Sequence, residues 1–270
     1  MTIESTFVET PYGRFHAESA GSGTPVLFLH GGTASSREWR PVLGALGRHA
    51  RCVAVDRLGC GDSDRSARGY DRDTVTRSLL ACADALGMEK FGVVGQSFGG
   101  FWALSMAFAA PARVSRLVLV NSAGGPMTDD EREAWRARTD ARRQATTAAD
   151  TLESRGEAAD RTIATIFADP RRVPPTFRDD LLWQMERADP GQLGALGDGF
   201  EGMGRERYDR ISCPTLVVWG EADSMIPLDR GRRLAAAIPG ARYAGLPGVG
   251  HTCQICLLYT SPSPRDRQKS

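Results

Sequence analysis

The sequence has few lysines, almost no net charge and no long apolar run, and each of these shortages excludes a class of function. Only two of its 270 residues are lysine, and the 34 basic residues are balanced by 33 acidic ones, which leaves a net charge of +1. No basic run is interleaved with aromatic residues, so nothing indicates a nucleic-acid partner. The longest apolar stretch, from Phe98 to Ala110, is too short to span a bilayer. Because Met1–Ser5 has neither the basic nor the apolar part of a secretory signal, we expect a cytoplasmic protein with no membrane partner.

Cysteine spacing gives no indication of a metal or redox site. Six Cys residues are present. The one closely spaced pair, Cys253 and Cys256, fits C-x-x-C, but Cys256 belongs to a C-terminal tail that we interpret below as non-native. We expect reduced, mostly buried thiols, and no metal or organic cofactor is implied. Hydrophobic residues make up 41% and charged residues 25%, which is ordinary for a globular protein.

Short apolar runs alternate with helical patterns along most of the chain. Two short edge strands are predicted at Thr6–Thr10 and Phe15–Ala20. Buried strands are predicted at Pro25–Leu29, Cys52–Val55, Gly92–Val94, Leu117–Val120, Thr215–Trp219 and Arg242–Gly245. Helices are predicted at Asp73–Leu86, from Phe98 onward, and at Leu228–Ile238. Strands that alternate with helices indicate an α/β fold with a mostly parallel, doubly wound sheet.

The motif Gly95-Gln96-Ser97-Phe98-Gly99-Gly100 carries the strongest chemical signal. It lies directly after a predicted strand and directly before an apolar helix. A serine in such a tight turn has its hydroxyl pushed out over the sheet edge, and glycine is required two residues to either side. The amides at the start of the following helix point toward the same place. The motif therefore predicts a nucleophile at Ser97, the alternative being an ordinary turn serine.

With this motif in place, the chain resembles the α/β-hydrolase family from about Thr6 to Ile255. Three further segments carry the resemblance: His30–Thr33 resembles the oxyanion loop, Asp56–Ser63 the D-x-x-G-x-G-x-S turn, and Gly220–Pro227 with Gly248–His251 the acid and histidine loops. The resemblance implies an eight-stranded sheet and catalytic residues in the chain order Ser97, Asp223, His251.

The resemblance also implies how the chain is divided. Residues 1–125 and 210–255 are expected to form the hydrolase core. Residues 126–209 are rich in Arg, Asp, Glu and Ala and are interpreted as an inserted helical cap. The alternative is a run of surface helices that does not cover the site. The segment Cys256–Asp266 resembles a translated sequencing adapter, so we expect residues 256–270 to be a non-native tail and the C-terminal helix to be truncated. The alternative is a natural Pro/Ser-rich tail.

The remaining catalytic roles follow from position. Four histidines are present, namely His16, His30, His49 and His251. Only His251 lies in a Gly-flanked loop after the last predicted strand, where it is expected to act as general base. Asp223 is expected to orient it, with Glu221 as the nearest competitor. Some relatives place the acid after the sixth strand, where this chain has Asn121.

Attack on an ester carbonyl produces an oxyanion, which needs two donors. The backbone N–H of Phe98 is expected to be one, and Gly32, with Thr33 as second choice, the other. The interpretation is a serine hydrolase that cleaves a small carboxylic ester or lactone through an acyl-enzyme. A serine nucleophile argues against haloalkane dehalogenases and epoxide hydrolases, which use Asp.

Two other functions stay open. Carbon–carbon bond hydrolases of aromatic degradation commonly have Asn where this chain has Gln96, although the segment Asn121–Gly125 is also seen in that group. Some proteins of this fold keep the triad yet act as small-molecule receptors.

Overall fold

The computed structural model describes residues 1–32, 34–145, 152–192 and 207–255. The predictions of a non-native tail and a truncated last helix concern residues 256–270, which lie outside the described residues.

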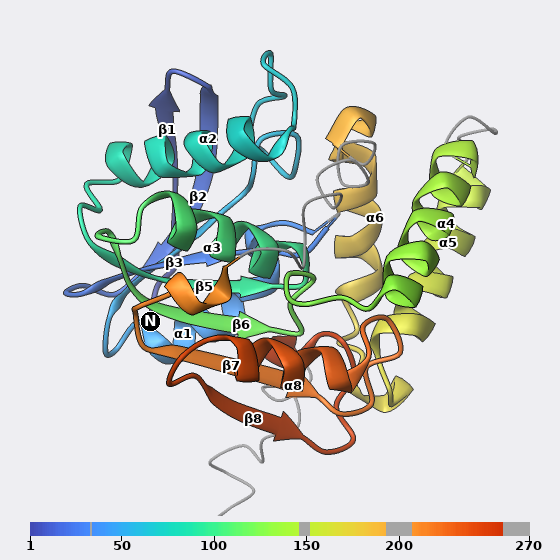
Figure 1. The fold of residues 1–270 in the computed structure, drawn as a ribbon. Helices are drawn as coiled ribbons and strands as arrows, with labels where there is room; N and C mark the ends of the chain where they lie inside the picture. The colour runs from blue at the N-terminus through green and yellow to red at the C-terminus, as the bar shows by residue number, and fades with distance from the viewer. Residues whose placement is uncertain (33, 146–151, 193–206, 256–270) are drawn as a thin grey trace, which may run out of the picture.

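Eight strands form one sheet in the order β1-β2-β4-β3-β5-β6-β7-β8 (Figure 1). Their bounds are β1 Glu4–Thr10, β2 Gly13–Ala20, β3 Pro25–Leu29, β4 Arg51–Val55, β5 Phe91–Gln96, β6 Val114–Val120, β7 Thr215–Gly220 and β8 Arg242–Leu246. The pairs β1–β2 and β2–β4 are antiparallel, and all later pairs are parallel. The predicted mostly parallel α/β-hydrolase sheet is confirmed.

One predicted feature of the sheet is wrong. Phe15–Ala20 lies within β2, which is paired on both sides, so only β1 is an edge strand at this end of the sheet. Ala17 pairs with Val55 and Ala20 with Cys52, which brings β4 rather than solvent to the second edge of β2. Strand order depends on pairing between distant segments, and local sequence patterns do not contain it.

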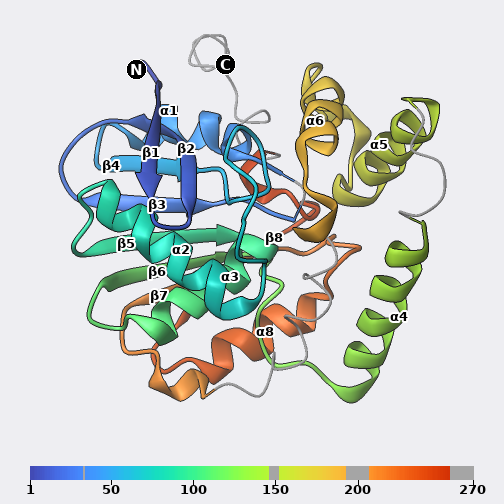
Figure 2. The ribbon, with the colours of Figure 1, turned by 90° about the horizontal axis from the view of Figure 1, so that it is seen from above.

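Helices cover both faces of the sheet. They are α1 Arg40–Leu46, α2 Arg72–Ala85, α3 Phe98–Ala109 and α8 Leu228–Ala237. In β3, Leu27 and Leu29 belong to the core beneath α2, α3 and α8, whereas Phe28 between them packs with Trp39 and Leu43 on the α1 face. This alternation follows from the two-residue period of a strand, and continuous apolar runs result because both faces are buried. Figure 2 shows α1 on the opposite side of the sheet from α2, α3 and α8.

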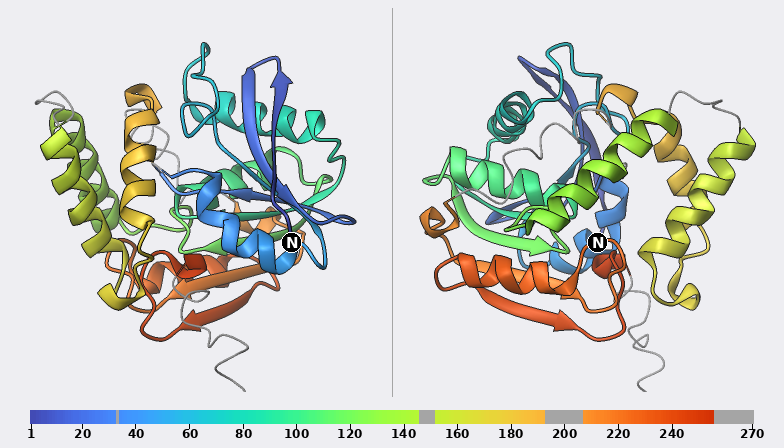
Figure 3. Two further views of the ribbon diagram at one scale, coloured as in Figure 1. Left: turned by 180° about the vertical axis from the view of Figure 1, so that it is seen from behind. Right: turned by 45° about the vertical axis from the view of Figure 1, so that its right-hand side comes forward.

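Between β6 and β7 the chain leaves the sheet and forms helices α4 Asp129–Ala145, α5 Leu152–Ile166 and α6 Phe177–Arg187. They lie beyond the edge toward which the parallel strands point (Figures 1 and 3). Helix α5 packs on α6, whereas α4 stands apart from both in Figure 2. The exact bounds of a cap at residues 126–209 stay a prediction. Short 3-10 helices complete the chain at η1 Ser36–Trp39, η2 Pro170–Arg172 and η3 Tyr208–Arg210. None of the helices in the described ranges is long and apolar enough to cross a membrane.

Candidate active site

Ser97 lies in the turn between β5 and α3 and has a φ angle of 51°, in the left-handed region that non-glycine residues rarely adopt. The surrounding backbone leaves no space for larger neighbours. A β-carbon on Gly95 would overlap the Gly99 carbonyl, and one on Gly99 would overlap the Leu29 carbonyl. The predicted need for glycine on either side of the serine is therefore explained by close backbone approach.

Backbone hydrogen bonds tie this turn to the segment that follows β6. The Ser97 amide donates to the Val120 carbonyl at 2.9 Å, and the Ala123 amide donates to the Ser97 carbonyl at 2.8 Å. Because β5 and β6 are neighbours in the sheet, the two turns that follow them are held side by side. The strained conformation of Ser97 is thus fixed from both directions.

The structure brings Asp223 and His251 together. Asp223 follows β7, His251 follows β8, and His251 Nδ1 lies 2.8 Å from Asp223 Oδ2. Their side chains are 0% and 4% exposed. The predicted competitor, Glu221, is exposed. Among the described residues, the Ser97 hydroxyl has no hydrogen bond to the His251 ring, and such bonds commonly tighten only when substrate is bound.

Asp223 is surrounded by donors that favour its charged form. Burial opposes ionisation, but hydrogen bonds from His251, the Ile226 amide and Asn121 outweigh it and hold the pKa of Asp223 below its ordinary value. A carboxylate that stays charged beside a histidine can fix the ring tautomer and stabilise the imidazolium form.

The predicted oxyanion loop lies directly beside the serine. A β-carbon built on Gly31 would be 3.7 Å from Ser97 Cβ, and one on Gly32 would be 3.6 Å from Phe98 Cδ2. The Phe98 ring therefore lies next to Gly32, and the role of the two backbone amides as oxyanion donors stays a prediction. Thr33 lies outside the described residues.

A buried arginine, which sequence reasoning missed, holds this loop. Arg57 is 2% exposed, and its guanidinium donates to the carbonyl oxygens of Gly31 at 3.0 Å and Gly32 at 2.9 Å, and to that of His30. His30 Nε2 accepts a hydrogen bond from the Arg57 backbone amide. Burial, which is the larger cause, and the positive charge of Arg57, which is the smaller, together lower the pKa of His30 to about 3. A neutral His30 supports the interpretation that it braces the loop rather than transferring protons.

Two further residues contact the loops around Ser97. Gln96 Nε2 donates to the His251 carbonyl at 3.1 Å, and a β-carbon on Gly31 would lie 2.5 Å from Gln96 Oε1. Gln96 thus lies between the histidine loop and the oxyanion loop. Glu38 accepts the Gly31 amide at 3.2 Å, and burial raises the pKa of Glu38 to about 8. In the sequence, Gln96 is distinguished only by the Asn that carbon–carbon bond hydrolases commonly have at this position. The contacts of Gln96 with the His251 and Gly31 loops could not be predicted, because these loops are distant along the chain.

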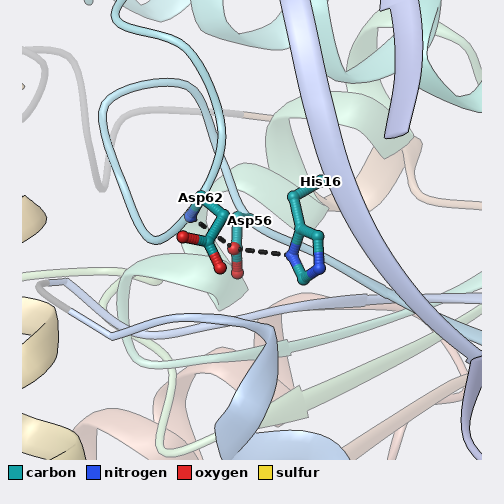
Figure 4. Close-up of side chains that lie close together, drawn as sticks. All are labelled: His16, Asp56 and Asp62. Carbon is teal, nitrogen blue, oxygen red and sulfur yellow. Dashed lines mark hydrogen bonds and ion pairs between the residues drawn. The ribbon is translucent and has the colours of Figure 1, made fainter. Parts of the chain in front are cut away.

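In a second cluster of polar side chains, His16, Asp56 and Asp62 approach one another (Figure 4). These three side chains could in principle hold a metal ion. The Asp56 oxygens, however, already accept His16 Nδ1 at 2.9 Å, the Ser36 amide at 2.5 Å and the Asp62 amide at 2.9 Å. The arrangement is that of a carboxylate that holds β2 and the turn after β4 together.

Comparison with known proteins agrees with this fold. A family model for the alpha/beta hydrolase fold matches residues 24–255. The 2-hydroxymuconate semialdehyde hydrolase of Pseudomonas sp. (strain CF600) is 30% identical over 258 residues, covering 90% of this chain and 85% of that protein. A hydrolase from Pseudomonas aeruginosa PA01 has a TM-score of 0.80 at 24% identity, over 93% of both chains. The carboxylesterase CesB from Bacillus subtilis has a TM-score of 0.78 at 23% identity, covering 100% of this chain and 90% of that chain. The chain belongs to the alpha/beta hydrolase fold family.

Proposed function

We propose that this chain is a serine hydrolase that cleaves a small carboxylic ester or lactone through an acyl-enzyme intermediate. The observation that carries the proposal is the buried His251–Asp223 pair, 2.8 Å apart, on loops next to a strained serine at the start of a helix. A serine hydroxyl is a weak nucleophile at neutral pH and needs such a base.

In the proposed mechanism, Ser97 Oγ attacks the ester carbonyl while His251 Nε2 takes the hydroxyl proton. The backbone amides of Phe98 and Gly32 stabilise the oxyanion, and the start of α3 adds its favourable dipole. His251 then gives the proton to the leaving alcohol as the tetrahedral intermediate collapses to the acyl-enzyme. Water, activated by the same histidine, releases the acid and restores Ser97.

Carbon–carbon bond hydrolysis is the second candidate. It is favoured by the 30% identity to a 2-hydroxymuconate semialdehyde hydrolase and by the segment Asn121–Gly125. Gln96 argues for the ester, because carbon–carbon bond hydrolases commonly have Asn at that position.

One substrate panel separates the two candidates. Purified protein is tested on p-nitrophenyl esters of increasing acyl length, on simple lactones and on 2-hydroxymuconate semialdehyde. We expect the highest kcat/KM on a short ester or a lactone. A kcat/KM for the semialdehyde that exceeds every ester and lactone would replace the first proposal by the second.

Replacing the nucleophile tests the mechanism itself. Ser97→Ala should lower kcat roughly 10⁴- to 10⁶-fold, because the triad acts as a unit. Ser22→Ala, at an exposed loop serine, is the matched control and should keep full activity. A fluorophosphonate should label wild type at Ser97 and leave Ser97→Ala unlabelled, as read by mass spectrometry. A Ser97→Ala protein with more than a few per cent of wild-type activity would refute the assignment.

A further inference from the structure

Asn121, directly after β6, has an unusual backbone conformation for a buried residue. It is 0% exposed and has a φ angle of 42°. In the described chain, Ser97 is the only other non-glycine residue with a positive φ. Such conformations cost free energy and persist where the surroundings fix them, and asparagine tolerates them better than most residues. The surroundings of Asn121, like those of Ser97, must therefore hold its backbone in place.

Its hydrogen bonds leave the amide one possible orientation. The Gly220 amide lies 3.2 Å from Oδ1, and a backbone N–H can only donate, so the atom facing it must be the oxygen. The Cys253 thiol donates to the same oxygen at 2.8 Å. The NH₂ group must then point the other way, where it donates to Asp223 Oδ2 at 2.6 Å.

Asp223 is thereby held at both of its oxygens. Oδ1 accepts the amides of Met225 at 2.8 Å and Ile226 at 3.1 Å, and Oδ2 accepts Asn121 and His251. An ionised carboxylate has about four acceptor positions, so these four donors fill it. Apart from His251, Asn121 is the one side chain among the described residues that donates to this carboxylate.

We infer that Asn121, with its amide oxygen held by both the Gly220 amide and the Cys253 thiol, is a positioning residue that holds Asp223 charged and aligned with His251 Nδ1. The inference rests on the proposed serine hydrolase function and adds two residues to its machinery. Neither residue touches the reacting atoms; both act through Asp223. The matching contribution of Asn121 to the lowered pKa of Asp223 agrees with this role.

The first test replaces Asn121 by glycine, which adopts a positive φ without cost and so removes the amide without adding strain. Asn121→Gly should lower kcat for the best ester about 10- to 100-fold, with KM within about twofold, because a hydrogen bond to a charged group is lost and substrate contacts are not. Thermal melting followed by circular dichroism confirms that the variant is folded. A folded variant with wild-type kcat overturns the inference, as does a change confined to KM.

The second test uses a matched pair at Cys253. Cys253→Ala removes one of the two donors that hold the Asn121 amide oxygen and should lower kcat about three- to tenfold. Cys253→Ser keeps a donor of similar size and should recover most of that loss. If the serine variant is as slow as the alanine variant, Cys253 acts through packing alone and its assigned role is wrong.

A third readout does not depend on turnover. The proton between His251 Nδ1 and Asp223 should give a far-downfield ¹H NMR resonance, identified by its loss in His251→Gln. Asn121→Gly should move or broaden this resonance, whereas Ser97→Ala should keep it. If wild type hydrolyses no ester, the proposed function fails while this resonance still tests the positioning role. An unchanged resonance in Asn121→Gly overturns the inference.

Discussion

His16 and Asp56 each stabilise the charged form of the other. The hydrogen bond from His16 Nδ1 to Asp56, against the opposing effect of burial, raises the pKa of His16 above 6.5. Burial opposes ionisation of Asp56, but the bond from His16 and those from the Ser36 and Asp62 amides outweigh it and lower the pKa of Asp56. His16 also contacts Ser5 in β1 through Nε2, at 2.8 Å, so the pair joins β1, β2 and the turn after β4.

The sign of each shift predicts a pH window for stability. The contribution from His16 is complete below its unfolded pKa of about 6.5 and is lost as the pH rises through the higher folded value. The contribution from Asp56 is complete above its unfolded value of about 3.9 and is lost as the pH falls through the lower folded one. His16→Gln should therefore lower the free energy of unfolding by about 1–3 kcal/mol at pH 6 and by less at pH 9.

Urea unfolding at the two pH values measures this difference. His49→Gln is the control, because His49 is exposed and should show little change at either pH. An equal loss of stability for His16→Gln at pH 6 and pH 9 would show that the charge on His16 contributes nothing.

At the scale of elements, cation–π contacts and ion pairs hold helix α6 to the core. Arg37, in η1, lies over the Trp183 ring of α6, with its guanidinium carbon 3.5 Å from the ring centre. Arg37 also forms an ion pair with Asp180 of α6 at 3.4 Å. Arg187 lies over the same ring at 4.4 Å and pairs with Asp62 at 3.5 Å. Because η1 and the turn that contains Asp62 also support the oxyanion loop, α6 is coupled to the candidate site.

Removing the stacked ring should loosen this contact. Trp183→Ala loses two cation–π contacts, each worth about 0.5–2 kcal/mol, and should raise KM about three- to tenfold with a smaller change in kcat. Trypsin, which cleaves after Arg, should cut between residues 126 and 209 faster than in wild type. Arg178→Ala is the control, because Arg178 pairs with Asp160 of α5 and not with the core. Equal proteolysis rates in Trp183→Ala and Arg178→Ala would contradict the coupling.

The elements also show what a sequence can and cannot predict. The turn at Ser97 was predictable because its glycines and flanking apolar runs are contiguous. The buried strands were predictable because each is a short, continuous apolar run. The roles of Arg57 and Asn121 were not, because Arg57 contacts residues about 25 positions earlier and Asn121 a carboxylate about 100 positions later. The exact site roles of Ser97, Asp223, His251, Gly32 and Phe98 stay predictions until the proposed variants are measured.

At the scale of the whole molecule, the reactivity of the cysteine thiols tests how tightly the core is packed. Five cysteines lie in the described ranges, and four of them are buried: Cys52, Cys60, Cys82 and Cys253. Burial raises the pKa of Cys60 to about 11 and that of Cys82 to about 12, so these thiols resist ionisation. In native buffer these four should react with a disulfide reagent far more slowly than in denaturant, where all six Cys of the chain should react. Peptide mapping of the labelled sites measures this, and rapid native labelling of Cys82 would contradict the packing of α2.

The crowding around Gly95, Gly99 and Gly31 means that the turns at the sheet edge tolerate fewer substitutions than the helices between β6 and β7. At these three positions even one methyl group would meet a carbonyl or the Gln96 amide, so mutation there disrupts the nucleophile turn or the oxyanion loop. Helices α4, α5 and α6 lie in the segment between β6 and β7, and outside the α6 contacts made by Asp180, Trp183 and Arg187 their sequence can change without disturbing that turn. We therefore expect descendants of this chain to vary in these helices while the glycines at the sheet edge stay unchanged.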